Sequence, residues 1–380
     1  MKQIEQKTID LLPNRKSFYL MRVLIVLLWS CCFGTVLAQS NNSTPVRELT
    51  QEGVRLYDAG KYNEAIAKYQ QALAAAPKDE TALSELALTY NELGRNAEAV
   101  AICEKLVKTN PDIDASVYVT YGNSLDAMKK SKQANQAYEQ GLKRHPDAYS
   151  LHYNAGVAQA TSGQIPASIN SFQQAVALNP RHGSSHMSLG MMQLGSHARV
   201  PGMMALGRFL VLEPHSARAA QRLPLLDQAM SQGAVKTGEN SISINISAEA
   251  LQGANGKSKG SDNFGPAEML LSISSAAALM PPPGMPVPTP IEQFSSRFGK
   301  LCKVLGELDE KETKTGFTWN YYVPYFVELE KKGFVPAFTY LVHASKTDDT
   351  EVQQWLAAHP AEVQVFQEWS KNYIWPKAVR

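Results

Sequence analysis

The chain is poor in cysteine and has almost no excess of charge of either sign. It has four cysteines in 380 residues, and its 37 Lys and Arg side chains nearly balance 35 Asp and Glu, leaving a formal net charge of +2. Because a nucleic-acid partner needs a basic stripe, which neither this balance nor the clustering of basic residues supplies, we expect no such partner. Binding to a membrane surface by charge is not expected either.

One long apolar run stands near the amino end of the chain. Residues 18–38 are apolar except for Arg22, follow a short basic region and end in small residues at Ala38. This arrangement is typical of a secretory signal, so we predict that residues 1–38 are a signal peptide and that the protein is exported, periplasmic or secreted. Lipidation at Cys31 and retention as a membrane anchor are the alternatives, since about 20 apolar residues just span a bilayer.

Removal of this segment changes the composition of the mature chain. Five basic and two acidic residues leave with it, which brings the formal charge to about −1. Only Cys103 and Cys302 remain, and they fall in different predicted domains. A disulfide would require their Cα atoms to lie within about 7 Å of each other, so two buried free thiols are expected.

What the chain does have is a regular series of prolines. They recur at intervals of 34 or 35 residues, and each ends an amphipathic helical stretch. Because proline lacks an N–H and cannot continue a helix, this period predicts a repeated helical hairpin. One hairpin cannot bury its apolar face alone, so three or more must stack. The prolines are Pro77, Pro111, Pro146, Pro180 and Pro214.

Small residues recur between the prolines. With the prolines aligned at place 32 of the repeat, the eighth place holds Gly53, Ala87, Gly122, Gly156 and Gly190, and the twentieth holds Ala65, Ala99, Ala134, Ser168 and Gly202. At the twenty-fourth place stand Tyr69, Cys103, Tyr138, Phe172 and Leu206. The pattern resembles the tetratricopeptide repeat family, whose unit has small residues at places 8, 20 and 27, an aromatic residue at 24 and proline at 32. The units are 45–78, 79–112, 113–147, 148–181 and 182–215, and Gly60, Gly94 and Gly163 lie where that family turns between its helices.

The resemblance implies an all-α, right-handed solenoid of helical hairpins that acts by binding proteins. Residues 216–233 are predicted to close the stack as a capping helix, although Pro224 interrupts it. Residues 234–290 are predicted to be a linker with one short strand near 241–247, one helix ending at Leu279 and a proline-rich spacer.

Residues 291–380 predict a smaller helical domain that is rich in aromatic residues. Phe294, Phe298 and Leu301 lie on one face of a helix, and four of the five tryptophans fall in this domain. Aromatic side chains at helical spacing are more often a core than a carbohydrate platform. The alternative to a purely structural role is that residues 291–380 form a glycan-binding or hydrolytic module, with the repeats as its docking arm. The tryptophans are Trp319, Trp355, Trp369 and Trp375.

The family's concave face supplies the candidate binding residues. Only one of its positions is basic here, so the groove lacks the cluster that family members use to hold a peptide's terminal carboxylate. The groove becomes apolar toward its carboxyl end, which predicts a binding site unless the capping helix or the second domain covers it. The candidates are Arg47, Tyr57, Asn91, Asn123, Tyr153, Val157, Met187, Met191 and Leu194.

Histidines near the end of the repeats do not predict a metal site. His182 and His186 are four residues apart, and His152 occupies the same place as His186 one repeat earlier. A zinc site needs three or four ligands, so interior histidines that pack between helices are the better interpretation. No catalytic residue, cofactor or metal is predicted. The sequence therefore predicts a non-enzymatic, protein-binding scaffold in the bacterial cell envelope.

Overall fold

A computed structural model describes residues 45–238, 241–246, 251, 262–279, 286–311 and 315–377, with the side chains of 310 and 311 left out. The predicted signal peptide lies outside the described residues. The chain divides into two compact units, one ending at Ile113 and the other beginning at Asp114, and each is described by itself. In the described parts of both units, no helix is long and apolar enough to cross a bilayer.

The first unit consists of helices that pack in antiparallel pairs. Residues 45–58 are helical and are followed by α2 (Tyr62–Ala75), α3 (Glu80–Glu92) and α4 (Asn96–Thr109). Asp79 caps α3 by accepting a hydrogen bond from the backbone N–H of Ala82 at 2.8 Å. These helices correspond to the first two predicted repeats.

The second unit begins with three further hairpins. In each hairpin the two helices pack against each other, and successive hairpins contact one another in turn. This arrangement confirms the predicted solenoid of helical hairpins. The helices are α5 (Ala115–Ala127), α6 (Ser131–Arg144), α7 (Tyr149–Thr161), α8 (Ile165–Leu178), α9 (Gly183–Gly195) and α10 (Arg199–Leu212).

A left-handed residue separates the two helices of every repeat. The predicted turn glycines are confirmed here, with φ of 73° at Gly60, 72° at Gly94 and 76° at Gly163. Lys129 and His197 take the same place in the third and fifth repeats, with φ of 62° and 60°. Glycine adopts this conformation without the Cβ clash that other residues meet, which explains its recurrence at the turn.

The glycine at the eighth place lets the paired helices approach closely. A Cβ atom on Gly156 would lie 2.8 Å from the Phe172 ring, which is buried at the twenty-fourth place of the same repeat. Gly53 and Gly122 meet Tyr69 and Tyr138 in the same way. The large ring therefore fills the space that the missing side chain leaves.

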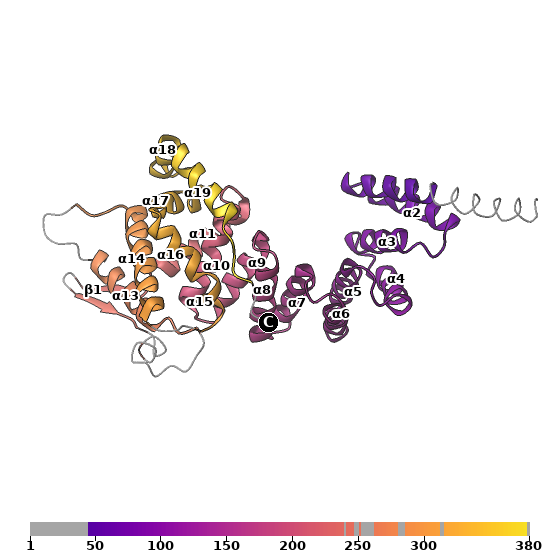
Figure 1. Ribbon diagram of the computed structural model, residues 1–380, viewed down its shortest axis with the longest axis horizontal. Helices are drawn as coiled ribbons and strands as arrows, with labels where there is room; N and C mark the ends of the chain where they lie inside the picture. The colour runs from indigo at the N-terminus through magenta and orange to yellow at the C-terminus, as the bar shows by residue number, and fades with distance from the viewer. Residues whose placement is uncertain are drawn as a thin grey trace, which may run out of the picture. The chain divides into compact units, whose positions relative to one another are not determined.

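Helix α10 is the central helix of the second unit. All its residues from Arg199 to Val211 are buried, because later helices cover the faces that the repeats leave open (Figure 1). One continuous hydrophobic core runs from Phe172 in α8 to Phe366 near the carboxyl end. The later helices are α11 (Ala217–Ser231), α13 (Gly265–Leu279), α14 (Pro290–Lys311), α15 (Phe317–Tyr321), α16 (Val323–Lys331), α17 (Val335–Val342), α18 (Thr350–Ala358) and α19 (Pro360–Asn372).

The structure differs from the expectation of a linker and a separate carboxyl-terminal domain. Helix α13 buries Ala267 and Leu271 and packs against α11 and α14, so it belongs to the folded core. Helices α10 and α17 also contact each other directly. The apolar face of the last repeat needs a cover, and the carboxyl-terminal helices provide it. Only the end of the predicted proline-rich spacer, from residue 286, is described.

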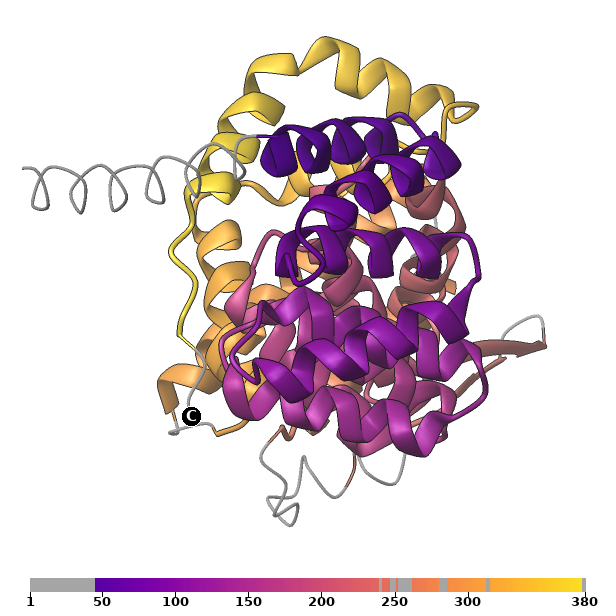
Figure 2. The same ribbon diagram turned by 90° about the vertical axis from the view of Figure 1, so that its right-hand side faces the viewer.

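The predicted strand has a partner that the sequence did not reveal. β2 (Ser241–Ile244) pairs antiparallel with β1 (Ala234–Gly238), which precedes it directly, with Ala234 opposite Ile244. This hairpin projects from the body of the second unit (Figure 2). Residues 241–247 alternate between polar and apolar side chains, which predicts a half-buried strand. The side chains of both strands are instead largely exposed, and Ile244 is 43% exposed.

Both cysteines of the described residues are buried and free, as expected. Burial raises the pKa of the Cys103 thiol to about 12 and that of Cys302 well above its usual range. Neither thiol is a nucleophile at neutral pH, because the thiolate is the reactive form.

Candidate functional site

In the first unit, the predicted groove residues carry polar groups, and two of the three are only partly exposed. Arg47 is exposed on the helix of residues 45–58. Tyr57 is half-buried with its ring 5.3 Å from that of Tyr62, and burial followed by the nearby Glu92 raises its pKa to about 12. Asn91 donates from Nδ2 to Oδ1 of Asn96 at 3.1 Å. These side chains offer few apolar contacts to a partner.

In the second unit, the first predicted groove residues serve the packing of the repeats. Asn123 on α5 accepts a hydrogen bond from the Tyr138 hydroxyl at 2.6 Å, so its amide supports the hairpin. Tyr153 on α7 is half-buried, with its ring centre 5.0 Å from that of His182. Val157, one turn further along α7, is 39% exposed. The apolar surface of this face therefore begins on α7.

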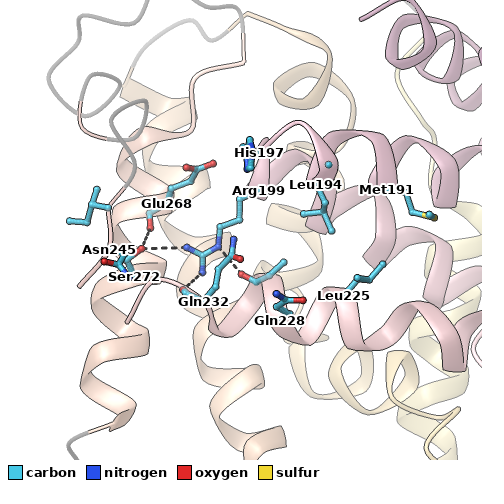
Figure 3. A pocket seen from close by; sticks show the side chains of 14 residues that line it. Met191, Leu194, His197, Arg199, Leu225, Gln228, Gln232, Asn245, Glu268 and Ser272 are labelled. Carbon is cyan, nitrogen blue, oxygen red and sulfur yellow. Dashed lines mark hydrogen bonds between the residues drawn. The ribbon is translucent and has the colours of Figure 1, made fainter. Parts of the chain in front are cut away.

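Helix α9 carries the apolar surface into a pocket. Met187, Met191 and Leu194 are half-buried on this helix and pack against the main core. Met191 and Leu194 also line a pocket of about 730 Å³, and Leu225 and Gln228 of α11 line it as well (Figure 3). The predicted capping helix thus covers this end of the groove in part and turns it into a pocket with two walls.

The inner end of the pocket is polar and built around Arg199, the first residue of α10. The Arg199 guanidinium donates to the carbonyl oxygens of Ala229 and Gln232, both at 2.7 Å, and contacts Ser272 Oγ at 3.4 Å (Figure 3). The two carbonyls close the carboxyl end of α11, where a cation is favourable. Burial lowers the Arg199 pKa to about 10, which still leaves the group charged at neutral pH.

The acidic side chain of Glu268 stands near this cation. It lines the same pocket, and its charge opposes the effect of burial on the pKa of Arg199. Asn245 and Gln232 add uncharged polar groups to the pocket lining (Figure 3). The pocket therefore has an apolar mouth of Met, Leu and Leu side chains and a polar floor, an arrangement that suits an apolar side chain next to a peptide backbone.

Sequence reasoning missed Arg199 and the polar floor. Residues 200–211 are almost wholly apolar, and a helix without a polar face is buried on all sides. The apolar run of residues 200–211 therefore indicated that other segments of the chain pack over every face of α10. The residues that form the cover, such as Ser272 and Gln232, lie in stretches without a motif, so the sequence did not connect them with the groove.

Each of the three histidines is hydrogen-bonded to a neighbouring group of the chain, and His152 Nε2 lies 2.8 Å from the Pro146 carbonyl oxygen. His186 is fully buried, with Nε2 3.0 Å from the Pro180 carbonyl oxygen and Nδ1 2.6 Å from the Tyr322 hydroxyl. His182 Nδ1 lies 2.7 Å from Ser185 Oγ. Within the described part of the chain, no three His, Cys, Asp or Glu side chains come together as a metal site would require.

The tryptophans of the carboxyl-terminal helices belong to the core. Trp319 is 2% exposed, and Trp355, Trp369 and Trp375 are half-buried against the same cluster of side chains. The rings of Tyr325 and Trp375 stack with their centres 4.9 Å apart. These rings use their surface for packing rather than for an open stacking platform.

The fold defines a protein built from repeated helical hairpins. Family models of tetratricopeptide repeats match residues 56–118 and 122–180. Residues 56–118 and 122–180 are therefore tetratricopeptide repeats.

The relatives match only part of the chain. The Hsp70-Hsp90 organizing protein of Triticum aestivum is 31% identical over 104 residues, which are 27% of this chain and 18% of that protein. Cellulose synthase operon protein C of Escherichia coli K12 is 36% identical over 73 residues, 19% of this chain and 6% of that protein. A tetratricopeptide repeat protein of Thermus thermophilus has a crystal structure that covers 48% of this chain and 98% of its own length, at 22% identity and a TM-score of 0.43. The chain therefore spans less than a fifth of the curated relatives named here.

Proposed function

We propose that this protein is an exported, non-enzymatic adaptor of the bacterial cell envelope, which binds a partner protein through the apolar end of its groove. The repeats support the general role, because stacked helical hairpins form concave binding surfaces. The apolar run of residues 18–38 supports export. The pocket that Met191 and Leu194 line is the observation that carries the choice of site.

The shape and chemistry of the pocket favour an extended or helical segment with a large apolar side chain. Methionines adapt to different partners, and the mouth of the pocket presents Met191 beside Leu194 and Leu225. A basic cluster for a terminal carboxylate is missing from the groove positions. Among the described residues that line the pocket, the Arg or Lys side chain is Arg199, which already donates to two backbone carbonyls. The partner segment is therefore internal to its chain and is held by apolar contacts.

Differential capture tests this proposal. The mature chain, beginning at residue 39, is used as bait for the periplasmic and cytoplasmic fractions of the source cells, alongside Met191→Glu. A charge in the apolar mouth should reduce recovery of the specific partner at least tenfold, because burial of an unpaired carboxylate is strongly unfavourable. The specific partner should come from the periplasmic fraction, and the mature protein isolated from cells should begin at Gln39.

A matched control separates loss of binding from loss of folding. Val365 on α19 is 55% exposed and lies outside the pocket, so Val365→Glu adds the same charge without touching the groove. It should recover the same partner as the parent chain. Recovery of the same proteins in equal amounts by all three baits would contradict the groove assignment, and a mature chain that retains residues 18–38 would contradict cleavage.

A further inference from the structure

A second cavity lies at the edge of the fourth repeat, away from the groove. It has a volume of about 480 Å³, and its lining includes Pro146, His152, Gln174 and Leu178. Lys377, near the carboxyl end, closes one side of it. The segment after α19 reaches this place by running back alongside the repeats toward α8 (Figure 1). Just before this segment, the Arg181 guanidinium donates to the carbonyl oxygen of Lys371, in the last turn of α19, at 3.1 Å.

The next repeat has the same arrangement, and there the chain itself fills it. Pro180, His186 and Arg208 follow Pro146, His152 and Gln174 by 34 residues each. The Tyr322 hydroxyl reaches His186, and the Arg208 guanidinium lies 5.1 Å from the centre of the Trp375 ring. Two aromatic side chains from the carboxyl-terminal helices and tail therefore occupy the fifth-repeat site.

The two histidines make the same hydrogen bond to the backbone. Nε2 of His152 lies 2.8 Å from the Pro146 carbonyl oxygen, and Nε2 of His186 lies 3.0 Å from that of Pro180. A carbonyl oxygen only accepts, so Nε2 carries the hydrogen in both rings, and Nδ1 of the neutral ring is left as an acceptor. In the fifth repeat the Tyr322 hydroxyl donates to this Nδ1 at 2.6 Å. Among the described residues, no hydroxyl meets the Nδ1 of His152.

We propose that the cavity of the fourth repeat binds a tyrosine side chain of a partner protein. The ring lies against Ala177 and Leu178, and the phenol hydroxyl donates to Nδ1 of His152 as Tyr322 does to His186. Two observations favour a neutral phenol over an aromatic ring without a donor. The acceptor geometry of His152 repeats that of His186, and Gln174 replaces Arg208, so the site has an amide where its neighbour has a cation. The partner's tyrosine would thus lie at the fourth repeat in the place that Tyr322 and Trp375 of this chain take at the fifth.

Paired small probes test the site in the full chain. p-Cresol carries the tyrosine ring and hydroxyl, and toluene carries the ring alone. We expect p-cresol to shift the ¹⁵N resonance of His152 Nδ1 with a Kd on the order of millimolar, as suits a ligand of this size. Toluene should bind about fivefold more weakly, because it cannot make the hydrogen bond, and should leave the Nδ1 resonance in place.

Two variants make the test specific to the cavity. His152→Phe keeps an aromatic ring and removes the acceptor, so p-cresol and toluene should bind equally. Ala177→Phe fills the cavity with a ring of its own and should abolish binding of both probes while His152 remains. Both variants must keep the far-UV circular dichroism of the parent chain, and one well-folded variant suffices for the comparison.

Three results would overturn the proposal. Equal binding of p-cresol and toluene to the parent chain would show that the hydroxyl makes no bond. A His152→Phe variant that still prefers p-cresol would place the acceptor elsewhere. Binding that is seen only after residues 378–380 are removed would identify the occupant as the end of this chain and not a partner.

Discussion

The buried histidine of the fifth repeat predicts a loss of stability in mild acid. His186 is fully buried and neutral, since burial, and after it the positive charge of Arg208, lowers its pKa to about 3. An unfolded chain exposes the same ring, whose ordinary pKa is about 6.5. As the pH falls below 6.5, the unfolded state takes up a proton that the folded state does not. The stability is therefore complete above pH 6.5 and is lost progressively toward pH 3.

The size of the effect follows from the two pKa values. Between pH 8 and pH 5, protonation of the unfolded state at His186 lowers the free energy of unfolding by about 2 kcal/mol, at 1.36 kcal/mol for each unit below 6.5. Any folded-state value below 4 gives nearly the same result over this range, because the folded ring is then still mostly neutral at pH 5. Urea denaturation of the full chain at the two pH values measures it.

Two variants isolate this histidine. His186→Gln preserves one donor for the Pro180 carbonyl and one acceptor for the Tyr322 hydroxyl but does not titrate, so its dependence on pH should be flatter than that of the parent by about 2 kcal/mol. Tyr322→Phe removes the hydroxyl and leaves the histidine buried, so it should cost about 1 kcal/mol or more at both pH values and keep the parent's pH dependence. Burial also lowers the pKa of His182. This residue is present in the parent chain and in both variants, so its contribution cancels when their pH dependences are compared.

The reasoning would be refuted if His186→Gln lost stability between pH 8 and pH 5 as steeply as the parent chain. The acid sensitivity would then come from other groups, and the ring would not be held neutral by its surroundings.

Two further predictions concern packing and charge in the second unit. Gly156→Ala should cost about 1–2 kcal/mol in urea denaturation, because its Cβ would press on the Phe172 ring. A Cβ on Gly195 would meet no atom within 4 Å apart from the backbone of its own helix, so Gly195→Ala should be neutral or stabilising by up to about 1 kcal/mol. Equal effects of the two substitutions would contradict the close approach at Gly156. Burial by itself raises the pKa of Asp227, but the bonds from His343 Nε2 and Lys346 Nζ, both at 2.9 Å, hold it below its usual value. Asp227→Asn should therefore cost about 1.5–3 kcal/mol at pH 7, with the difference shrinking as the pH falls below about 4, where the unfolded parent chain takes up a proton at this carboxylate before the folded chain does. Asp348 is exposed, so Asp348→Asn is the control. An equally large loss of stability in that variant would contradict the assignment of the effect to the contacts of Asp227 with His343 and Lys346.

The repeats were predictable because their signals are local. Proline at the end of each hairpin, glycine at the turn and a small residue opposite a large ring each act within about 34 residues, and each reappears in the structure at its expected place. The helix that carries Phe294, Phe298 and Leu301 was also predicted from its apolar spacing and corresponds to α14, whereas the five-residue α15 is too short to show a period. Strand β2 was found without its partner, since β1 carries no alternating pattern.

The candidate site was predicted in part. The apolar character of Met191 and Leu194 was visible in the sequence, and so was the question of what covers them. The answer depends on contacts between segments far apart in the chain, such as Arg199 with Ser272, 73 residues later. No periodicity of the sequence encodes a contact at that distance, because the spacing of residues within a helix determines its own faces and not which distant segment packs against them.

The sequence by itself determined that this chain is built from helical hairpins and that its groove becomes apolar toward Pro214, because both properties follow from residue types at fixed short spacings. Only the tertiary structure decided that the last helices are the cover of the fifth repeat and not a separate domain. A helix such as α10, apolar on every side, must be surrounded, but many apolar segments could surround it, and which one does so is settled by packing.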